Sequence, residues 1–444
     1  MNLLHPGARV LDAETGATLS PGEVDAAAAA FAQLPPGIVF ALTPTELGAV
    51  ARYLGALAAG RPIALLDPEL DPEVLHALVE RFGPVQVTGV SSAPPADYRA
   101  EGDTWLRETP AIEPHPDLAL LLTTSGSTGN PKLVRLSRAA VEANAAAIAD
   151  SLEITPDDVA PTTLPLFYTY GLSVLNSHLL RGATVVLERG GILQRGFWTV
   201  VAERGITTLA AVPYQYEMLR RLRFDPAAHP KLRTLTQAGG RLRTELVQDF
   251  AERMATVGGR LFVMYGQTEA TARMAVLPPD RIKDKLGSAG LPIPGGSFSV
   301  DSDEVVFTGP NVMMGYADSA ADLAKPDELG GILRTGDLGH LDDEGFLFLT
   351  GRLKRIGKVF GVRVNLDDVE RTLAAHGAIA AVAGDDKLHV FVEGADADRA
   401  RAIRGELAAF LGTHFTGLDV RGIDALPLLP TGKVDYRSLE ARAV

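Results

Sequence analysis

Ten consecutive residues, 123–132, combine the groups that bind phosphate in proteins. Glycine lets backbone N–H groups converge on an anion, hydroxyl side chains donate hydrogen bonds, and lysine supplies a point charge. The spacing is not that of the common P-loop, because Pro131 interrupts it and Leu133 stands where that motif needs Ser or Thr. A flexible polar loop is the simpler interpretation of such a cluster, but the dense ordering of glycines and hydroxyls favours phosphate binding. The candidate residues are Thr123, Thr124, Ser125, Gly126, Ser127, Thr128, Gly129 and Lys132.

The segments on either side of this loop predict how it is held. Residues 118–122 are an uninterrupted apolar run, which is typical of a buried strand, and residues 137–148 are rich in alanine and predict a helix. We therefore expect the loop to connect a strand directly to a helix, where it could wrap around a polyphosphate.

A second group of polar residues, 265–269, follows an expected strand at 261–264. Tyr265 offers an aromatic face that suits a purine, and Glu269 offers a carboxylate, which Mg²⁺ prefers together with phosphate oxygens. Gly266, Gln267 and Thr268 complete the group. The alternative is a turn at a strand end with a solvated glutamate.

Two shorter motifs are weak when each is taken alone. Gly239, Gly240 and Arg241 lie between an expected strand at 234–237 and an expected helix at 244–257, where a tight turn is the ordinary outcome. Asp337 could accept hydrogen bonds from both hydroxyls of a ribose, although Asp beside Gly is also common turn chemistry.

Basic residues near the end of the chain form two further motifs. Residues 351–358 contain Arg352 and Lys354 in a cluster that would usually be a solvated face. Lys433 lies almost at the C-terminus, in a loop that Pro430 and Gly432 restrict, whereas a lysine near a chain end is normally solvated.

Taken in order, these six motifs resemble those of the adenylate-forming superfamily. This superfamily contains the acyl- and aryl-CoA synthetases, the adenylation domains of peptide synthetases and firefly luciferase. The resemblance covers nearly the whole chain, but the chain is shorter than most relatives ahead of the phosphate loop.

The resemblance implies a role for each motif. The loop at 123–132 would bind the ATP phosphates, and Gly239, Gly240 and Arg241 would let the adenine approach the backbone. Tyr265 would stack on adenine, Thr268 would contact the α-phosphate, and Glu269 would hold Mg²⁺; Gly266 and Gln267 belong to the same nucleotide site. Asp337 would bind the ribose, Arg352 the ribose or a phosphate, and Lys354 would be the hinge between two domains. Lys433 would be the catalytic lysine that reaches the carboxylate and the α-phosphate together.

The expected substrate is a small carboxylic acid in a pocket near residues 165–171. By resemblance Tyr168 stands where many relatives have His, and Tyr170, Gly171, Tyr214 and Met264 are further candidates for an apolar slot that would take an aromatic or medium aliphatic acid. The same residues could equally be core. No Asp occurs between Asp158 and Asp225, which disfavours an α-amino acid, since adenylation domains for such substrates hold the ammonium with Asp in this region.

The predicted reaction converts ATP and a carboxylate to an acyl-adenylate and pyrophosphate, and then transfers the acyl group. The expected cofactors are ATP and Mg²⁺, and the expected acceptor is a thiol, either coenzyme A or the phosphopantetheine of a free acyl carrier protein. An amide-forming ligase that uses an amine is the rival enzyme. A nucleotide-binding module without catalysis is the non-enzymatic alternative.

Composition excludes several other classes of protein. The 444 residues contain no cysteine, so disulfides, thiolate zinc sites and cysteine nucleophiles are absent. The net charge of −13 argues against non-specific binding to nucleic acid or to an anionic membrane. The start of the sequence lacks the features of a signal peptide, and the apolar runs are too short to span a bilayer. We expect a cytoplasmic protein that binds neither nucleic acid nor membrane.

Strands and helices alternate through much of the chain, which predicts an α/β fold with doubly wound parallel sheets. We expect residues 1–37 to be irregular apart from a short helix at 26–30, and residues 91–117 to form a long surface connection. After about residue 285, Gly and Pro become frequent and the expected strands shorten, which predicts a small β subdomain. We expect a large domain at 1–353 and a small, mobile α+β domain at 354–444.

Overall fold

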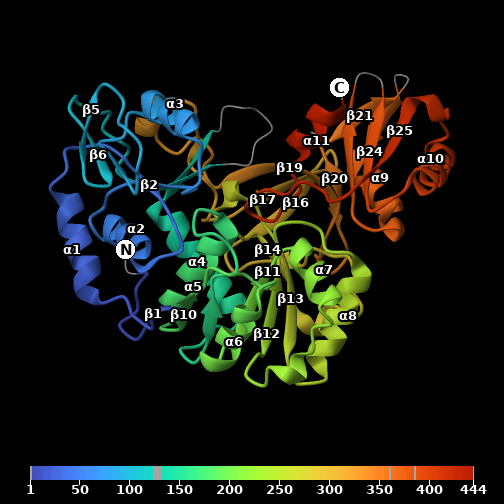
Figure 1. The fold of residues 1–444 in the computed structure, drawn as a ribbon, viewed down its shortest axis with the longest axis horizontal. Helices are drawn as coiled ribbons and strands as arrows, with labels where there is room; N and C mark the ends of the chain where they lie inside the picture. The colour runs from blue at the N-terminus through green and yellow to red at the C-terminus, as the bar shows by residue number, and fades with distance from the viewer. Residues whose placement is uncertain (1–2, 124–131, 354, 360–361, 385–386, 444) are drawn as a thin grey trace.

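The computed structural model describes residues 3–123, 132–353, 355–359, 362–384 and 387–443. In the described residues up to 353, the strands form two large sheets and two smaller ones. The described residues after 353 form a separate lobe at the upper right of Figure 1. The predicted α/β fold, with a large N-terminal part and a small C-terminal part, is confirmed.

The first sheet has eight strands in the order β18-β8-β7-β3-β2-β4-β6-β5. Its central strands β7, β3, β2 and β4 run parallel, and helices α2 and α3 connect them. The strands β2 and β3 are buried along their whole length, which explains why they are continuous apolar runs instead of alternating ones. The bounds are β2 Val39–Leu42, α2 Leu47–Ala58, β3 Ile63–Leu66, α3 Pro72–Phe82, β4 Gln86–Thr88, β5 Tyr98–Glu101, β6 Thr104–Arg107, β7 Leu118–Thr123, β8 Leu133–Ser137 and β18 Gly315–Ala317.

The second sheet has five strands in the order β11-β12-β13-β14-β15, of which the first three are parallel. The carboxyl ends of parallel strands meet at one edge, which is where ligands bind in open α/β sheets. That edge carries Val212 after β11, Gly239 after β12 and Tyr265 at the end of β13. The bounds are α6 Arg195–Glu203, β11 Thr208–Ala211, α7 Pro213–Arg221, β12 Thr234–Gln237, α8 Thr244–Ala255, β13 Arg260–Tyr265, β14 Ala275–Leu277 and β15 Leu291–Pro292.

A three-stranded parallel sheet, β1-β10-β9, and two helices complete this part of the core. The helices α4 and α5 pack against each other between the first and second sheets (Figure 1). The bounds are β1 Arg9–Asp12, α1 Pro21–Ala32, α4 Arg138–Ser151, β9 Val159–Pro161, α5 Thr169–Leu180 and β10 Thr184–Leu187.

The predicted β subdomain is an antiparallel sheet, β16-β17-β19-β20, and it leads into the C-terminal lobe. That lobe has its own apolar cores, one between α9, α10 and the sheet β23-β24-β25 and one beneath α11. The bounds are β16 Ser297–Asp301, β17 Glu304–Thr308, β19 Ile332–Leu341, β20 Leu347–Arg352, β21 Ile356–Val359, β22 Val362–Asn365, α9 Leu366–Thr372, β23 Ile379–Ala383, β24 Leu388–Glu393, α10 Ala397–Leu411, β25 Leu418–Ile423 and α11 Tyr436–Ala443. No helix in these described ranges is both long and apolar enough to cross a membrane.

Three expectations about local structure were wrong. The chain after residue 132 does not enter a helix directly, because the strand β8 pairs with β7 and Ser137 then caps α4. The segment 91–117 is not a plain connection, since β5 and β6 form a hairpin that buries Trp105. The N-terminal segment contains β1 and a helix longer than expected, which a capping box of Ser20 and Glu23 starts.

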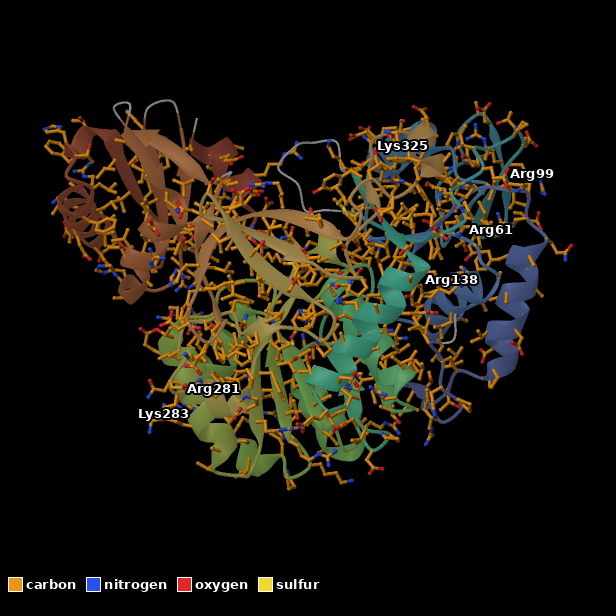
Figure 2. The ribbon with its side chains drawn as sticks, turned by 180° about the vertical axis from the view of Figure 1, so that it is seen from behind. Arg61, Arg99, Arg138, Arg281, Lys283 and Lys325 are labelled. Carbon is orange, nitrogen blue, oxygen red and sulfur yellow. The ribbon has the colours of Figure 1, made fainter. Side chains whose placement is uncertain are left out.

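The buried guanidinium of Arg135 fixes strand β18, which carries Tyr316, beside β8. It donates to the backbone oxygens of Lys325 at 2.6 Å and Met314 at 3.0 Å, and it forms an ion pair with Glu328. Lys325 lies at the surface in Figure 2, so Arg135 ties this outer loop to β8, the second strand of the sheet.

We expect Arg135→Met to lower the free energy of unfolding by about 2 kcal/mol, because it leaves two backbone oxygens and a carboxylate without their charged donor. The control is Arg99→Met, also labelled in Figure 2, whose ion pair with Glu101 is exposed at both ends and should contribute about 0–1 kcal/mol. Urea unfolding of both variants measures the difference. Equal losses would contradict the role given to Arg135.

Candidate functional site

The hairpin of β19 and β20 brings two of the predicted nucleotide-binding residues together. Asp337 and Arg352 lie opposite each other in register, with Arg352 Nε 2.8 Å from Asp337 Oδ1. The hydroxyl of Tyr265 donates to the other oxygen of the buried Asp337 carboxylate. Burial and the nearby Asp337 charge raise the pKa of Tyr265 well above its usual value, so its hydroxyl remains a neutral donor.

The chain after Tyr265 turns back sharply. A hydrogen bond of 2.7 Å from Ala272 N to Ala270 O closes a γ-turn on Thr271, whose φ of 64° is strained for a β-branched residue. The returning chain passes so close to Gly266 that a Cβ there would lie 1.8 Å from Ala272 O. Thr271 is held by its hydroxyl, which donates to Asn311 O, and by its carbonyl, which accepts from Thr169. The turn therefore fixes Thr268 and Glu269 relative to Tyr265.

The pairing of β8 with β18 brings Tyr316 near Lys132, and Tyr316 in turn contacts Glu269. The Glu269 carboxylate accepts a hydrogen bond of 2.7 Å from the Tyr316 hydroxyl. The ammonium of Lys132 lies 5.7 Å from the centre of the Tyr316 ring and 3.0 Å from Asp318. Thr123, which ends β7, is half-buried. The other predicted phosphate-binding residues, 124–129, lie outside the described residues.

Lys433 lies on a tight hairpin of the C-terminal lobe. Leu428 and Val434 pair across it, Gly432 N donates to Leu429 O at 2.8 Å, and Gly432 has a φ of +76°, which favours glycine. The hairpin enters the N-terminal part of the molecule, where Lys433 Nζ lies 5.2 Å from the centre of the Tyr168 ring.

The surroundings of Lys433 are dry and charged. Burial and the nearby Arg352 guanidinium lower the pKa of Lys433 to about 8, while Glu269 and Asp337 act in the opposite direction. Three predicted site residues, of which Glu269 is the most distant at 164 positions in sequence, thus act directly on Lys433.

Two glycines let the hairpin fit the edge of the second sheet. A Cβ on Gly432 would lie 2.8 Å from a methyl group of Val212, and a Cβ on Gly239 would lie 2.6 Å from the Tyr168 hydroxyl. An ion pair of 3.2 Å between Arg221 and Glu393 joins the two parts of the molecule. The docked arrangement therefore depends on small residues at the point of contact.

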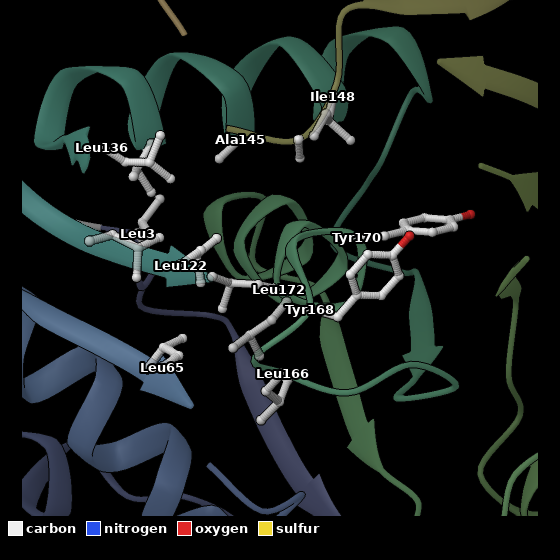
Figure 3. Close-up of a cluster of buried hydrophobic side chains, with 14 of the residues drawn as sticks. Leu3, Leu65, Leu122, Leu136, Ala145, Ile148, Leu166, Tyr168, Tyr170 and Leu172 are labelled. Carbon is white, nitrogen blue, oxygen red and sulfur yellow. The ribbon is translucent and has the colours of Figure 1, made fainter. Parts of the chain in front are cut away.

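The predicted substrate residues divide into two sets. Tyr168 and Tyr170 are buried with edge-to-face rings 6.4 Å apart, and their hydroxyls extend toward the same side in Figure 3. Met264 and Tyr170 line a small cavity of about 10 Å³ behind them. Gly171 instead packs against the carbonyl of Pro165, and the half-buried Tyr214 on α7 does not line this cavity.

The remaining predicted residues lie at the periphery of the site. Gly240 O accepts from the Gln237 amide at 2.7 Å, the exposed Arg241 donates to Leu349 O at 3.4 Å, and Gln267 donates to Thr335 O at 3.3 Å. Thr268 begins the short helix η2, Thr268–Ala270. Lys354 lies outside the described residues.

Sequence reasoning missed three residues that contribute to the site. Tyr316 binds Glu269, Val212 meets the Lys433 hairpin, and Arg273 lies buried behind the tyrosines. Only Arg273 had a signal in the sequence, as a lone charge within the apolar stretch 272–277.

Comparison with known proteins gives consistent results. The family model for AMP-binding enzymes matches residues 5–317. Indoleacetate–CoA ligase of Aromatoleum aromaticum is 31% identical over 439 residues, which span 93% of this chain and 80% of that protein. The 2-succinylbenzoate–CoA ligase of Bacillus subtilis is 32% identical over 275 residues, or 59% of this chain and 54% of that ligase.

Solved structures share the fold. The o-succinylbenzoate CoA synthetase of Bacillus subtilis, in complex with its acyl-adenylate intermediate, matches with a TM-score of 0.75 and 23% identity over 97% of this chain and 94% of that one. ATP-bound MatB from Rhodopseudomonas palustris matches with a TM-score of 0.77 and 22% identity over 98% and 96%.

The family model covers more than half of the chain, and a named acid–CoA ligase is similar over nearly all of it. The prediction of an AMP-forming acid–thiol ligase is thereby confirmed, and the chain belongs to the family of AMP-binding enzymes.

Proposed function

We propose that this chain activates a small carboxylic acid with ATP and Mg²⁺ and transfers the acyl group to coenzyme A, with Lys433 as the residue that acts on the reacting atoms. The observation that carries the proposal is the docked hairpin. It holds one ammonium between Tyr168, on the side of the expected acid, and the charges of Glu269, Asp337 and Arg352, on the side of the expected nucleotide.

The first half-reaction joins two anions. An oxygen of the substrate carboxylate attacks the α-phosphorus of ATP, the bond to the bridging oxygen breaks, and pyrophosphate leaves with the electron pair. Charge develops on the α-phosphate oxygens during this step, and a fixed cation in a dry site stabilises it more strongly than water would. The ammonium of Lys433 meets this requirement, and no side-chain nucleophile is needed.

The nucleotide is held by residues from three elements. Tyr265 would stack on the adenine, Gly239 and Gly240 would allow its close approach, and Asp337 would accept hydrogen bonds from the ribose with the lone pairs that Tyr265 and Arg352 leave free. Lys132, together with the loop before it, would bind the phosphates.

The residues present fit a magnesium ion that ATP brings with it. No group of three or more His, Asp or Glu side chains within the described ranges could hold a metal by itself. Mg²⁺ usually takes only one or two carboxylates and completes its shell with phosphate oxygens and water, so Glu269 could supply the protein ligand. When bound, the ion would neutralise phosphate charge.

Transfer to the thiol requires Lys433 to leave the site. We propose that residues 354–444 form a domain that turns about Lys354 relative to residues 1–353 and opens the path for the acceptor. Coenzyme A is favoured because Indoleacetate–CoA ligase, which is similar over most of both chains, carries that acceptor in its name.

The test of the proposed function is ATP–pyrophosphate exchange with a panel of carboxylic acids, followed by mass spectrometry of the products formed with coenzyme A, a free acyl carrier protein or an amine. An acid-dependent exchange and an acyl-CoA product support the proposal. Exchange followed only by an amide or a carrier-bound product would overturn the assignment of the acceptor.

We expect Lys433→Ala to lower pyrophosphate exchange by about 100- to 1000-fold, which is typical of removing one group that stabilises developing charge. Transfer from a synthetic acyl-adenylate to coenzyme A should change by only a few-fold, because Lys433 acts in the first half-reaction. The control is Lys387→Ala, at an exposed lysine of the same lobe. Full exchange activity in Lys433→Ala would exclude this role.

The pH dependence of exchange should report Lys433. Its pKa in the nucleotide-free protein is lowered to about 8, so the ammonium is charged below about pH 8 and neutral above it. Since kcat/KM reports groups of the free enzyme, it should fall about tenfold per pH unit above pH 8. Lys433→Arg should be slower but lack this fall, because arginine remains charged. The same fall in both proteins would show that another group titrates.

A further inference from the structure

Arg273 is a buried charge that the adenylation chemistry described above does not use. It is 3% exposed and lies two residues after the γ-turn centre at Thr271. Its backbone is fixed on both sides, because Arg273 N donates to the Asn144 side chain at 3.2 Å and Arg273 O accepts from Asn144 at 2.9 Å and from Asn311 at 3.0 Å. These bonds fix the backbone position from which the Arg273 side chain extends.

The guanidinium of Arg273 is only partly satisfied. It donates to the Ser173 hydroxyl at 3.2 Å and lies 4.5 Å from the centre of the Tyr170 ring. Its Nε has no hydrogen-bond acceptor, and no carboxylate of the described chain pairs with it. Burying a charge without an opposite charge is costly, which indicates that a ligand supplies the missing partner.

Arg273 lines a small cavity. Tyr170, Thr236 and Met264 line this cavity together with Arg273, and so does His178, whose Nε2 is also buried without a partner. Two unpartnered polar atoms predict a polar occupant instead of an aliphatic tail. The small volume, about 10 Å³, suits a compact group.

Two tyrosine rings link the surroundings of Lys433 to Arg273. Lys433 Nζ is 5.2 Å from the Tyr168 ring, the Tyr168 and Tyr170 rings are 6.4 Å apart, and the Arg273 guanidinium is 4.5 Å from the Tyr170 ring. An acid whose activated carboxylate contacts Lys433 and which extends along these rings would bring its far end toward Arg273.

We propose that Arg273 binds a second carboxylate at the far end of the substrate, so that this enzyme activates a short dicarboxylic acid. This inference rests on the proposed function, and it replaces the apolar slot expected from sequence with a pocket that ends in a cation. The planar guanidinium can donate from Nε and Nη2 to both oxygens of one carboxylate, which gives selectivity as well as affinity.

The test measures pyrophosphate exchange with two sets of probe acids. One set is the α,ω-dicarboxylic acids of about four to eight carbons, and the other is the monocarboxylic acids of equal length. We expect kcat/KM of the wild-type chain to favour the best diacid over its monoacid by about 100-fold or more, because a site built around a buried polar partner rejects analogues that lack it. A preference of the wild-type chain for the monoacids would overturn the inference without any variant.

The variant Arg273→Met, which keeps an unbranched side chain but removes the guanidinium and its charge, should reverse the preference. Arg138→Met is the matched control, because its guanidinium binds Leu57 O at 2.9 Å near the surface of the N-terminal part, where Figure 2 labels it. An unchanged diacid preference in a folded Arg273→Met protein would overturn the inference. Failure of the proposed function has a different signature, namely no exchange with any acid in the wild-type chain.

Discussion

The site depends on one interaction, the insertion of the Lys433 hairpin at the carboxyl ends of β11, β12 and β13. Adenylation brings a carboxylate and a polyphosphate together, and their repulsion is reduced only if a cation lies between them in a region with little water. The depressed pKa of Lys433 reflects the cost of placing the ammonium there before the anions arrive. The hairpin belongs to a separate lobe, and the proposed turn of that lobe would withdraw the same cation when the thiol enters.

Strand pairing and one strained turn position the other groups around this cation. The register of β19 with β20 sets Asp337 against Arg352, and the register of β8 with β18 sets Lys132 near Tyr316, which contacts Glu269. The γ-turn at Thr271 reverses the chain between Glu269, the proposed ligand of Mg²⁺, and Arg273, which lines the cavity. Backbone strain of this kind persists where surrounding contacts determine the conformation, as those of Asn144, Asn311 and Thr169 do here.

Sequence patterns predicted the parts of the fold that long apolar runs encode. The strand β12 coincides with the expected range 234–237, because continuous burial favours an uninterrupted strand sequence. The hairpin of β5 and β6 was missed because its short strands mix charged and apolar residues, and β8 was missed because it follows the loop without a break. Tyr316 could not be predicted, since only tertiary pairing brings it to Glu269. Arg273 was visible as a charge in an apolar run, but its partners come from distant segments.

The most direct test is to lock the lobe in the docked position. The chain has no cysteine, so Arg221→Cys and Glu393→Cys introduce the only two thiols, at an ion pair of 3.2 Å that joins the lobes away from the reacting groups. A short bifunctional maleimide should leave pyrophosphate exchange intact and stop transfer to the thiol. Transfer at the rate of the uncrosslinked double variant, or loss of exchange on crosslinking, would contradict the claim that the docked hairpin is the adenylating state.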